Sequence, residues 1–126
     1  MEQRFLIDTN VIIDGFGNKL TEKGNLFLCS LIPIISVVTK IEVLGWRNAT
    51  IDQLRPLEDF MAFATILPID DQVISKTINI RQNNKIALGD AIIAATAIVY
   101  NLTILTRNIS DFKNIENLMV VNPYDL

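Results

Sequence analysis

The stretch that decides the fold is FLIDTNVII at residues 5–13, where a short apolar run ends abruptly in three polar residues. A short continuous apolar run is typical of a strand that is buried on both faces of a parallel sheet. Asp8, Thr9 and Asn10 are residue types that begin helices, and residues 11–13 are apolar again. The stretch therefore predicts a buried strand that is followed at once by a helix.

The same alternation of short apolar runs and helical patterns continues along the chain. Further strands are expected at residues 34–38, 66–69, 103–106 and 118–121. Helices are expected at about 21–31, 39–44, 51–64, 70–83 and 90–100. Pro68 places one strand near an edge of the sheet, because proline cannot donate to a strand ladder. Alternating strands and helices predict an α/β fold, a five-stranded parallel sheet with helices on both faces.

The composition bounds the organisation of the chain and excludes several kinds of chemistry. Its 126 residues predict one domain over residues 1–126, and it contains no histidine. The usual Ser-His and Cys-His nucleophiles are therefore excluded. The single cysteine, Cys29, lies in an apolar stretch and is expected to be buried. Because the chain shows neither a signal-peptide pattern nor a clean apolar span of about 20 residues, we expect a cytoplasmic protein outside the membrane.

Four carboxylates are expected to meet at one edge of the sheet, because parallel sheets bind ligands at the carboxyl ends of their strands. Asp8 ends the first strand, and Glu42 lies in the helix after the second. Asp90 opens an alanine-rich helix, and Asp111 follows the fourth strand. Their mutual repulsion would force protonation unless a cation lay among them, and oxygen ligands alone favour Mg²⁺ or Mn²⁺. Such an ion can activate water and stabilise a phosphoryl oxygen, which indicates phosphodiester hydrolysis.

Each carboxylate also has a purely structural explanation. Asp8 could serve only as a helix cap, and so could Asp90, although its apolar neighbours make an unpaired charge costly there. Glu42 alone would be an ordinary solvated helix residue, and Asp111 alone would be a loop or cap residue. The other acidic residues considered are assigned to solvated faces or caps: Asp14, Asp52, Glu58, Asp59, Asp70 and Asp71.

Four blocks of the sequence together resemble the PIN-domain family, and within it the VapC-type toxin ribonucleases of bacterial toxin-antitoxin pairs. The blocks are FLIDTNVIID at residues 5–14, SVVTKIEVL at 36–44, DAIIAATA at 90–97 and LTRNISDF at 105–112. The resemblance covers nearly the whole chain, and the order and spacing of the four blocks make it specific. One local departure is Gly89, since many relatives have proline just before the third acidic residue.

The resemblance implies a three-layer fold with a five-stranded parallel sheet and an Mg²⁺- or Mn²⁺-dependent endoribonuclease that acts on RNA. The acidic residues of the family fall on the four already identified: Asp8, Glu42, Asp90 and Asp111. The residues that would support the site or bind substrate are Thr9, Asn10, Thr106, Arg107 and Asn108. Family members of this kind usually form homodimers and are held inactive by a small antitoxin, so both partners are expected here.

Other functions are weighed against this one. An aspartyl-nucleophile phosphatase would start from Asp8 but would need a second aspartate at the position of Asn10. A receiver-like signalling module would need a phosphoacceptor after the third strand, such as Asp70 or Asp71, and a lysine that residues 122–124 do not supply. A catalytically silent PIN-like binding module is a further alternative, although all four acidic positions are filled.

The net charge of −3 is unusual for a protein that acts on RNA, because phosphate backbones favour a basic surface. Setting aside the four candidate metal ligands leaves 10 acidic residues against 11 basic ones. The remaining surface is close to neutral, so the intrinsic affinity for RNA is expected to be modest. Arg107 and Lys85 are the residues expected to position phosphate.

Overall fold

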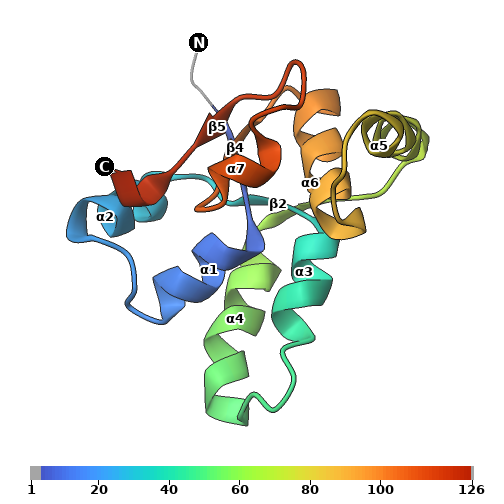
Figure 1. The fold of residues 1–126 in the computed structure, drawn as a ribbon. Coiled ribbons are helices and arrows are strands. Elements are labelled where there is room, and N and C mark those ends of the chain that lie inside the picture. Colours follow the sequence, from blue (N-terminus) through green and yellow to red (C-terminus); the bar gives the residue numbers. More distant parts are fainter. Residues whose placement is uncertain (1–3, 126) are drawn as a thin grey trace.

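A parallel five-stranded sheet forms the centre of the computed structural model, which describes residues 4–125 (Figure 1). The strand order is β3-β2-β1-β4-β5, and every strand pair is parallel. The strands are β1 Phe5–Ile7, β2 Ile34–Ser36, β3 Thr65–Leu67, β4 Thr103–Leu105 and β5 Val120–Val121. The prediction of an α/β fold is confirmed, and so is the edge position of β3. Because β1 is central, the residue that follows it leaves the sheet at its middle.

Helices cover both faces of this sheet. They are α1 Thr9–Phe16, α2 Glu22–Ser30, α3 Val37–Leu44, α4 Ile51–Phe63, α5 Asp71–Asn83, α6 Leu88–Val99 and α7 Ile109–Phe112, followed by the 3-10 turn η1 Pro123–Asp125. Alternate residues of β1 face opposite sides. Leu6 belongs to the core cluster that contains residues of α5, α6 and α7, whereas Phe5 and Ile7 belong to the cluster that contains residues of α1, α3 and α4. This two-sided burial explains why the strand is apolar without alternation.

The first residues of two helices and the exposure of one residue differ from the sequence-based prediction. The helix α1 begins directly at Thr9, and α6 begins at Leu88, two residues before the expected start. Cys29 is exposed, so the prediction of a buried cysteine is wrong. The helix α2 lies at the surface and turns Phe27 and Leu28, not Cys29, towards the core. Within residues 4–125 no helix is long and apolar enough to cross a membrane.

Candidate active site

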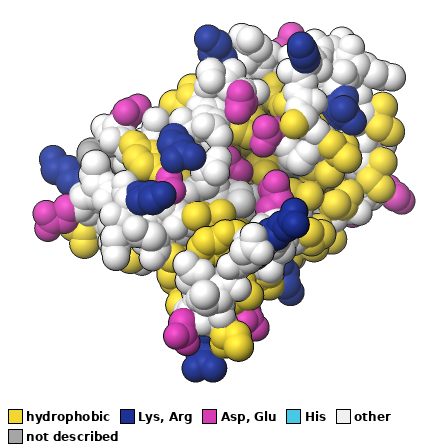
Figure 2. All heavy atoms as spheres, turned by 60° about the horizontal axis from the view of Figure 1, so that its bottom comes forward, with side chains coloured by type: hydrophobic (Ala, Val, Ile, Leu, Met, Phe, Trp, Pro, Cys, Tyr) yellow, Lys and Arg dark blue, Asp and Glu magenta, His cyan; other side chains and the backbone are white. Residues whose placement is uncertain are grey.

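The carboxyl ends of the strands open onto a face where acidic side chains gather in the middle and basic side chains flank them (Figure 2). A cavity of about 400 Å³ lies on the side of this face that α6 and α7 form. Asp90 and Asp111 both line it, and Lys85 lines it as well. Two of the four predicted carboxylates therefore share one polar cavity.

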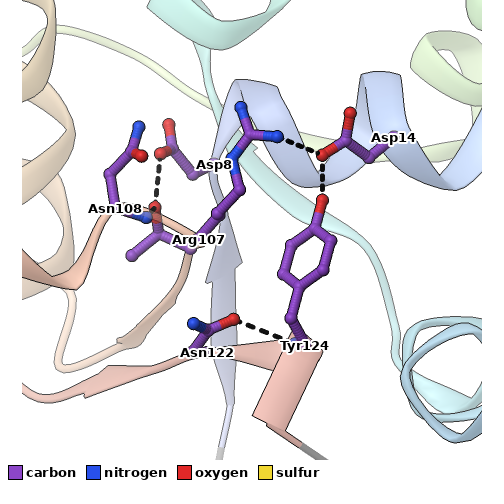
Figure 3. A network of polar contacts seen from close by, with 7 residues as sticks. Asp8, Asp14, Arg107, Asn108, Asn122 and Tyr124 are labelled. Atoms are coloured by element: carbon purple, nitrogen blue, oxygen red, sulfur yellow. Dashed lines mark hydrogen bonds and ion pairs between the residues drawn. The ribbon is translucent and has the colours of Figure 1, made fainter. Parts of the chain in front are cut away.

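Asp8 is the most deeply placed of the four, with only 3% of its surface exposed. Its Oδ1 accepts a hydrogen bond from the backbone N–H of Thr9 at 2.8 Å, which makes it the N-cap of α1. Its Oδ2 accepts from the hydroxyl of Thr106 at 2.7 Å, and the N–H of Asn108 donates to that hydroxyl oxygen at 3.0 Å (Figure 3). Asp8 is thus a helix cap and is also held from the β4 side of the sheet.

Burial raises the pKa of Asp8, and the nearby charges of Glu42 and Asp111 raise it further, whereas the hydrogen bonds from Thr106 and Thr9 lower it. The net shift is upward. The hydrogen bonds therefore fix the orientation of this carboxylate without offsetting the cost of its buried charge. A cation would offset that cost.

Glu42 is exposed on α3, yet its side chain is tied to α1. The hydroxyl of Thr9 donates to its Oε1 at 2.8 Å and lies 3.4 Å from the hydroxyl of Thr39. The other carboxylate oxygen lies 3.6 Å from the point where a Cβ at position 89 would be. Glu42 therefore reaches from α3 to the first turn of α6, where Asp90 lies.

Asp90 lies in the first turn of α6 but does not cap that helix. The N-cap residue is Ala87, and no side chain caps the helix. Burial raises the pKa of Asp90 to about 6, and the charges of Asp8, Asp111 and Glu42 contribute to the same shift, in that order. The capping explanation therefore fails. The three groups that raise the pKa of Asp90 by their charge are the three other predicted carboxylates.

The donor set fits a hard divalent ion better than any other group. Among the described residues, no three His, Cys, Asp or Glu side chains are close enough to hold a metal ion as they stand. Mg²⁺, however, usually keeps several of its waters and takes only one or two carboxylates directly. Such an ion therefore needs only one or two direct carboxylate ligands. The cluster can supply them, because its carboxylates repel one another and two of them have raised pKa values that a cation would lower.

Of the supporting residues, Thr9, Thr106 and Asn108 contact the cluster in the ways just described. Asn10 is half-buried in α1, and no hydrogen bond places its side chain at the cluster. Asp111 is exposed and lies within α7. The structure thus brings the four predicted carboxylates into one electrostatic cluster, and their metal-binding roles stay predictions.

Comparison with known proteins identifies the family of this chain. The model of the PIN domain matches residues 5–118. The chain belongs to the PIN-domain family. This PIN domain is 29% identical to Ribonuclease VapC1 of Rickettsia felis, over 92% of its own length and 93% of the relative. It is 32% identical to Ribonuclease VapC of Rickettsia bellii, over the same shares.

Solved structures extend the likeness to three dimensions. A chain of a toxin-antitoxin complex from Klebsiella pneumoniae is 30% identical to this PIN domain, with a TM-score of 0.79 over 98% of this chain and 100% of that one. FitAcB from Neisseria gonorrhoeae is 27% identical, with a TM-score of 0.82 over 97% of this chain and 99% of that one. The family predicted from the four sequence blocks is confirmed.

Asp14 was expected on a solvated face, and that prediction is wrong. Only 4% of its surface is exposed. Its Oδ2 accepts a hydrogen bond from Nη1 of Arg107 at 2.9 Å and another from the hydroxyl of Tyr124 (Figure 3). A signal for this burial exists in the sequence, because Asp14 lies three residues after the buried Val11 and so shares its face of the helix.

Asp70 does cap a helix, as expected. Its Oδ1 accepts from the N–H of Val73 at 2.9 Å, and its Oδ2 accepts from the hydroxyl of Tyr100 at 2.5 Å. The hydrogen bond from Tyr100 is the main reason that the pKa of Asp70 is lowered. This carboxylate is committed to structural contacts, which gives no support to a receiver-like phosphoacceptor at this position.

The raised pKa of Asp90 predicts a pH-dependent loss of stability in the metal-free PIN domain. In the unfolded chain an aspartate has a pKa of about 3.9. The folded state therefore binds this proton more tightly, and the resulting stability is complete below about pH 4 and is lost as the pH rises through about 6. Between pH 5 and pH 7 in EDTA, the Tm of the wild type should fall relative to that of Asp90→Asn. Parallel Tm profiles would contradict the prediction, and Asp52→Asn, on an exposed face, is the control.

Proposed function

We propose that the protein is a metal-dependent endoribonuclease that acts as the toxin of a toxin-antitoxin pair. The observation that carries the proposal is geometric: Asp90 and Asp111 line one polar cavity, and the Glu42 carboxylate reaches the first turn of α6 beside them. Burial raises the pKa of Asp90, and the charges of Asp8, Asp111 and Glu42 accordingly help to raise it. The curated relatives named as VapC ribonucleases support the activity. The complex from Klebsiella pneumoniae supports the toxin role.

The four carboxylates have different proposed roles in binding the metal ion. Asp8 and Asp90 would hold the principal ion, and Glu42 and Asp111 would complete the site. Bound there, Mg²⁺ or Mn²⁺ would activate water and stabilise charge that develops on a phosphoryl oxygen. The carboxylate of Asp8 is already oriented for the ion, because the hydroxyl of Thr106 and the N–H of Thr9 each donate to one of its oxygens.

The RNA would meet this site from the open face. Lys85 lines the cavity beside Asp90 and Asp111, where its ammonium group can approach a phosphate. The rest of the surface carries little net positive charge, since 11 basic residues face 10 acidic ones outside the cluster. Modest affinity for the RNA backbone is therefore expected, with binding that weakens as salt is added.

A surface for a protein partner lies between α1, α2 and α4. A cavity of about 410 Å³ is lined mostly by apolar side chains there, and Phe16 and Phe63 border it. Phe63 is 80% exposed and Phe16 is 46% exposed. Exposed apolar patches of this kind mark protein interfaces. We assign this surface to a protein partner, and the partners expected are an antitoxin and a second copy of this chain. The location expected for the protein is the cytoplasm.

The test is cleavage of a single-stranded RNA in the presence of Mg²⁺ or Mn²⁺. We expect cleavage with either ion, its loss in EDTA and its recovery when the ion is restored. Cleavage that persists in EDTA would contradict the metal-dependent site. The toxin role has its own test, which is growth arrest on expression and its relief by a neighbouring small gene.

A further inference from the structure

Near Asp8, three side chains join segments that are distant in the sequence (Figure 3). Asp14 comes from α1, Arg107 follows β4, and Tyr124 lies in η1. Asp14 Oδ2 accepts from both partners, with Arg107 Nη1 at 2.9 Å. The guanidinium carbon of Arg107 lies 5.9 Å from the centre of the Tyr124 ring. The three residues therefore contact one another pairwise.

Arg107 stays half-exposed, with 48% of its side chain accessible, but its Nη1 is held on the buried Asp14. A carboxylate with only 6% of its side chain exposed needs a cation and hydrogen bonds to be stable, and Asp14 receives both. The ion pair also offsets the charge of Arg107 and uses part of its hydrogen-bonding edge. Such an arginine is better suited to hold its own loop in place than to attract a phosphate.

The loop that Arg107 holds carries two residues next to Asp8. Thr106 is fully buried and donates to Asp8, and the N–H of Asn108 donates to Thr106. Figure 3 shows the side chain of Asn108 beside that of Asp8. Because Arg107 lies between Thr106 and Asn108, fixing its side chain restricts both neighbours. Asp8 and Asp14 are at opposite ends of α1, so the loop is attached to this helix at both ends.

Tyr124 is itself firmly placed. Its N–H donates to Oδ1 of Asn122 at 2.9 Å, and η1 packs closely on α2. A Cβ at Gly24 would lie 2.5 Å from the carbonyl oxygen of Pro123, so only glycine allows this approach. Tyr124 also lies beyond residues 5–118, the part that the PIN-domain model matches.

We propose that Asp14 and Tyr124 are positioning residues for the acidic cluster. Through Arg107 they hold Thr106 and Asn108 against Asp8, and so they govern metal affinity and turnover rather than RNA affinity. The inference rests on the proposed function. It assigns to Arg107 the role of supporting the site and not that of binding phosphate.

Tyr124→Phe tests the proposal, because it removes one hydroxyl and keeps the ring. We measure kcat and KM on a single-stranded RNA, and Mn²⁺ affinity by calorimetric titration. Outer-shell contacts of metal ligands are worth roughly 10- to 100-fold, so we expect kcat and Mn²⁺ affinity to fall about tenfold with KM unchanged within about twofold. The matched control is Tyr100→Phe, which removes the same hydroxyl from another aspartate at the far end of α6 and should leave all three constants unchanged.

A double-mutant cycle with Arg107→Gln decides whether Tyr124 acts through Arg107. Arg107→Gln should lower kcat and Mn²⁺ affinity, and adding Tyr124→Phe should change them little further. Full additivity would overturn the proposal, and so would an Arg107→Gln variant that raises KM with kcat unchanged. A wild type that binds Mn²⁺ but cleaves no RNA would contradict the proposed function alone. In that case equal Mn²⁺ affinities of wild type and Tyr124→Phe would overturn the positioning role.

Discussion

Asp8→Asn and Asp90→Asn should each abolish metal-dependent cleavage of RNA. Asparagine keeps the size of the side chain but removes the charge that would hold the ion. The ion supplies several kcal/mol of transition-state stabilisation, so kcat should fall about a thousandfold or more. Single-turnover cleavage at saturating RNA in excess Mn²⁺ measures the effect. Asp52→Asn, the same change on an exposed turn of α4, should keep full activity.

Asp90→Asn should lose activity without losing thermal stability. In metal-free protein at pH 7, the charged form of Asp90 is disfavoured by burial and by three other carboxylates. Its replacement by asparagine should therefore keep or raise the Tm. Mn²⁺ should raise the Tm of the wild type, because it binds only the folded state, and should not raise that of Asp90→Asn. An Asp90→Asn protein that cleaves RNA at the wild-type rate would contradict the assignment.

The position of Asp8 could be predicted because it depends on local rules. A run of three apolar residues that ends at a carboxylate marks the end of a buried strand, and parallel strands end at one edge. In the structure, Ile7 pairs with Leu105, so the residues that follow these two strands, Asp8 and Thr106, lie side by side. Their 2.7 Å hydrogen bond follows from that register.

The network of Asp14, Arg107 and Tyr124 could not be predicted, because it depends on contacts between distant parts of the chain. Asp14 and Tyr124 are 110 residues apart, and no local pattern joins them. Helical spacing indicates that Asp14 is on the buried face of α1, but not what it meets there. Cys29 shows the same limit, since an apolar neighbourhood in sequence does not decide which side of a surface helix faces the core.

The helix α7 is not among the helices expected from the sequence, and its short length explains the difference. Four residues are too few to show a helical period or to be stable alone in water. Tertiary packing must therefore hold this turn. Phe112 is 1% exposed and belongs to the same core cluster as residues of α5 and α6. One side chain accordingly anchors the helix that carries Asp111.

Phe112→Ala should therefore remove both stability and the position of a candidate ligand. Truncation of a fully buried phenylalanine costs about 3–5 kcal/mol, which is a large part of the roughly 5–15 kcal/mol that stabilises a typical domain. Urea unfolding measures the loss, and Ile51→Ala is the control, because Ile51 is 75% exposed, does not line the apolar partner surface and should cost less than about 0.5 kcal/mol when truncated.

The effect on the site can be separated from unfolding by titrating Mn²⁺ at a low temperature where Phe112→Ala is still folded. If Phe112 holds α7, Asp111 loses its fixed place beside Asp90, and Mn²⁺ affinity falls while that of Ile51→Ala does not. Equal affinities in the two folded variants would contradict the role of Phe112 in placing Asp111 as a ligand.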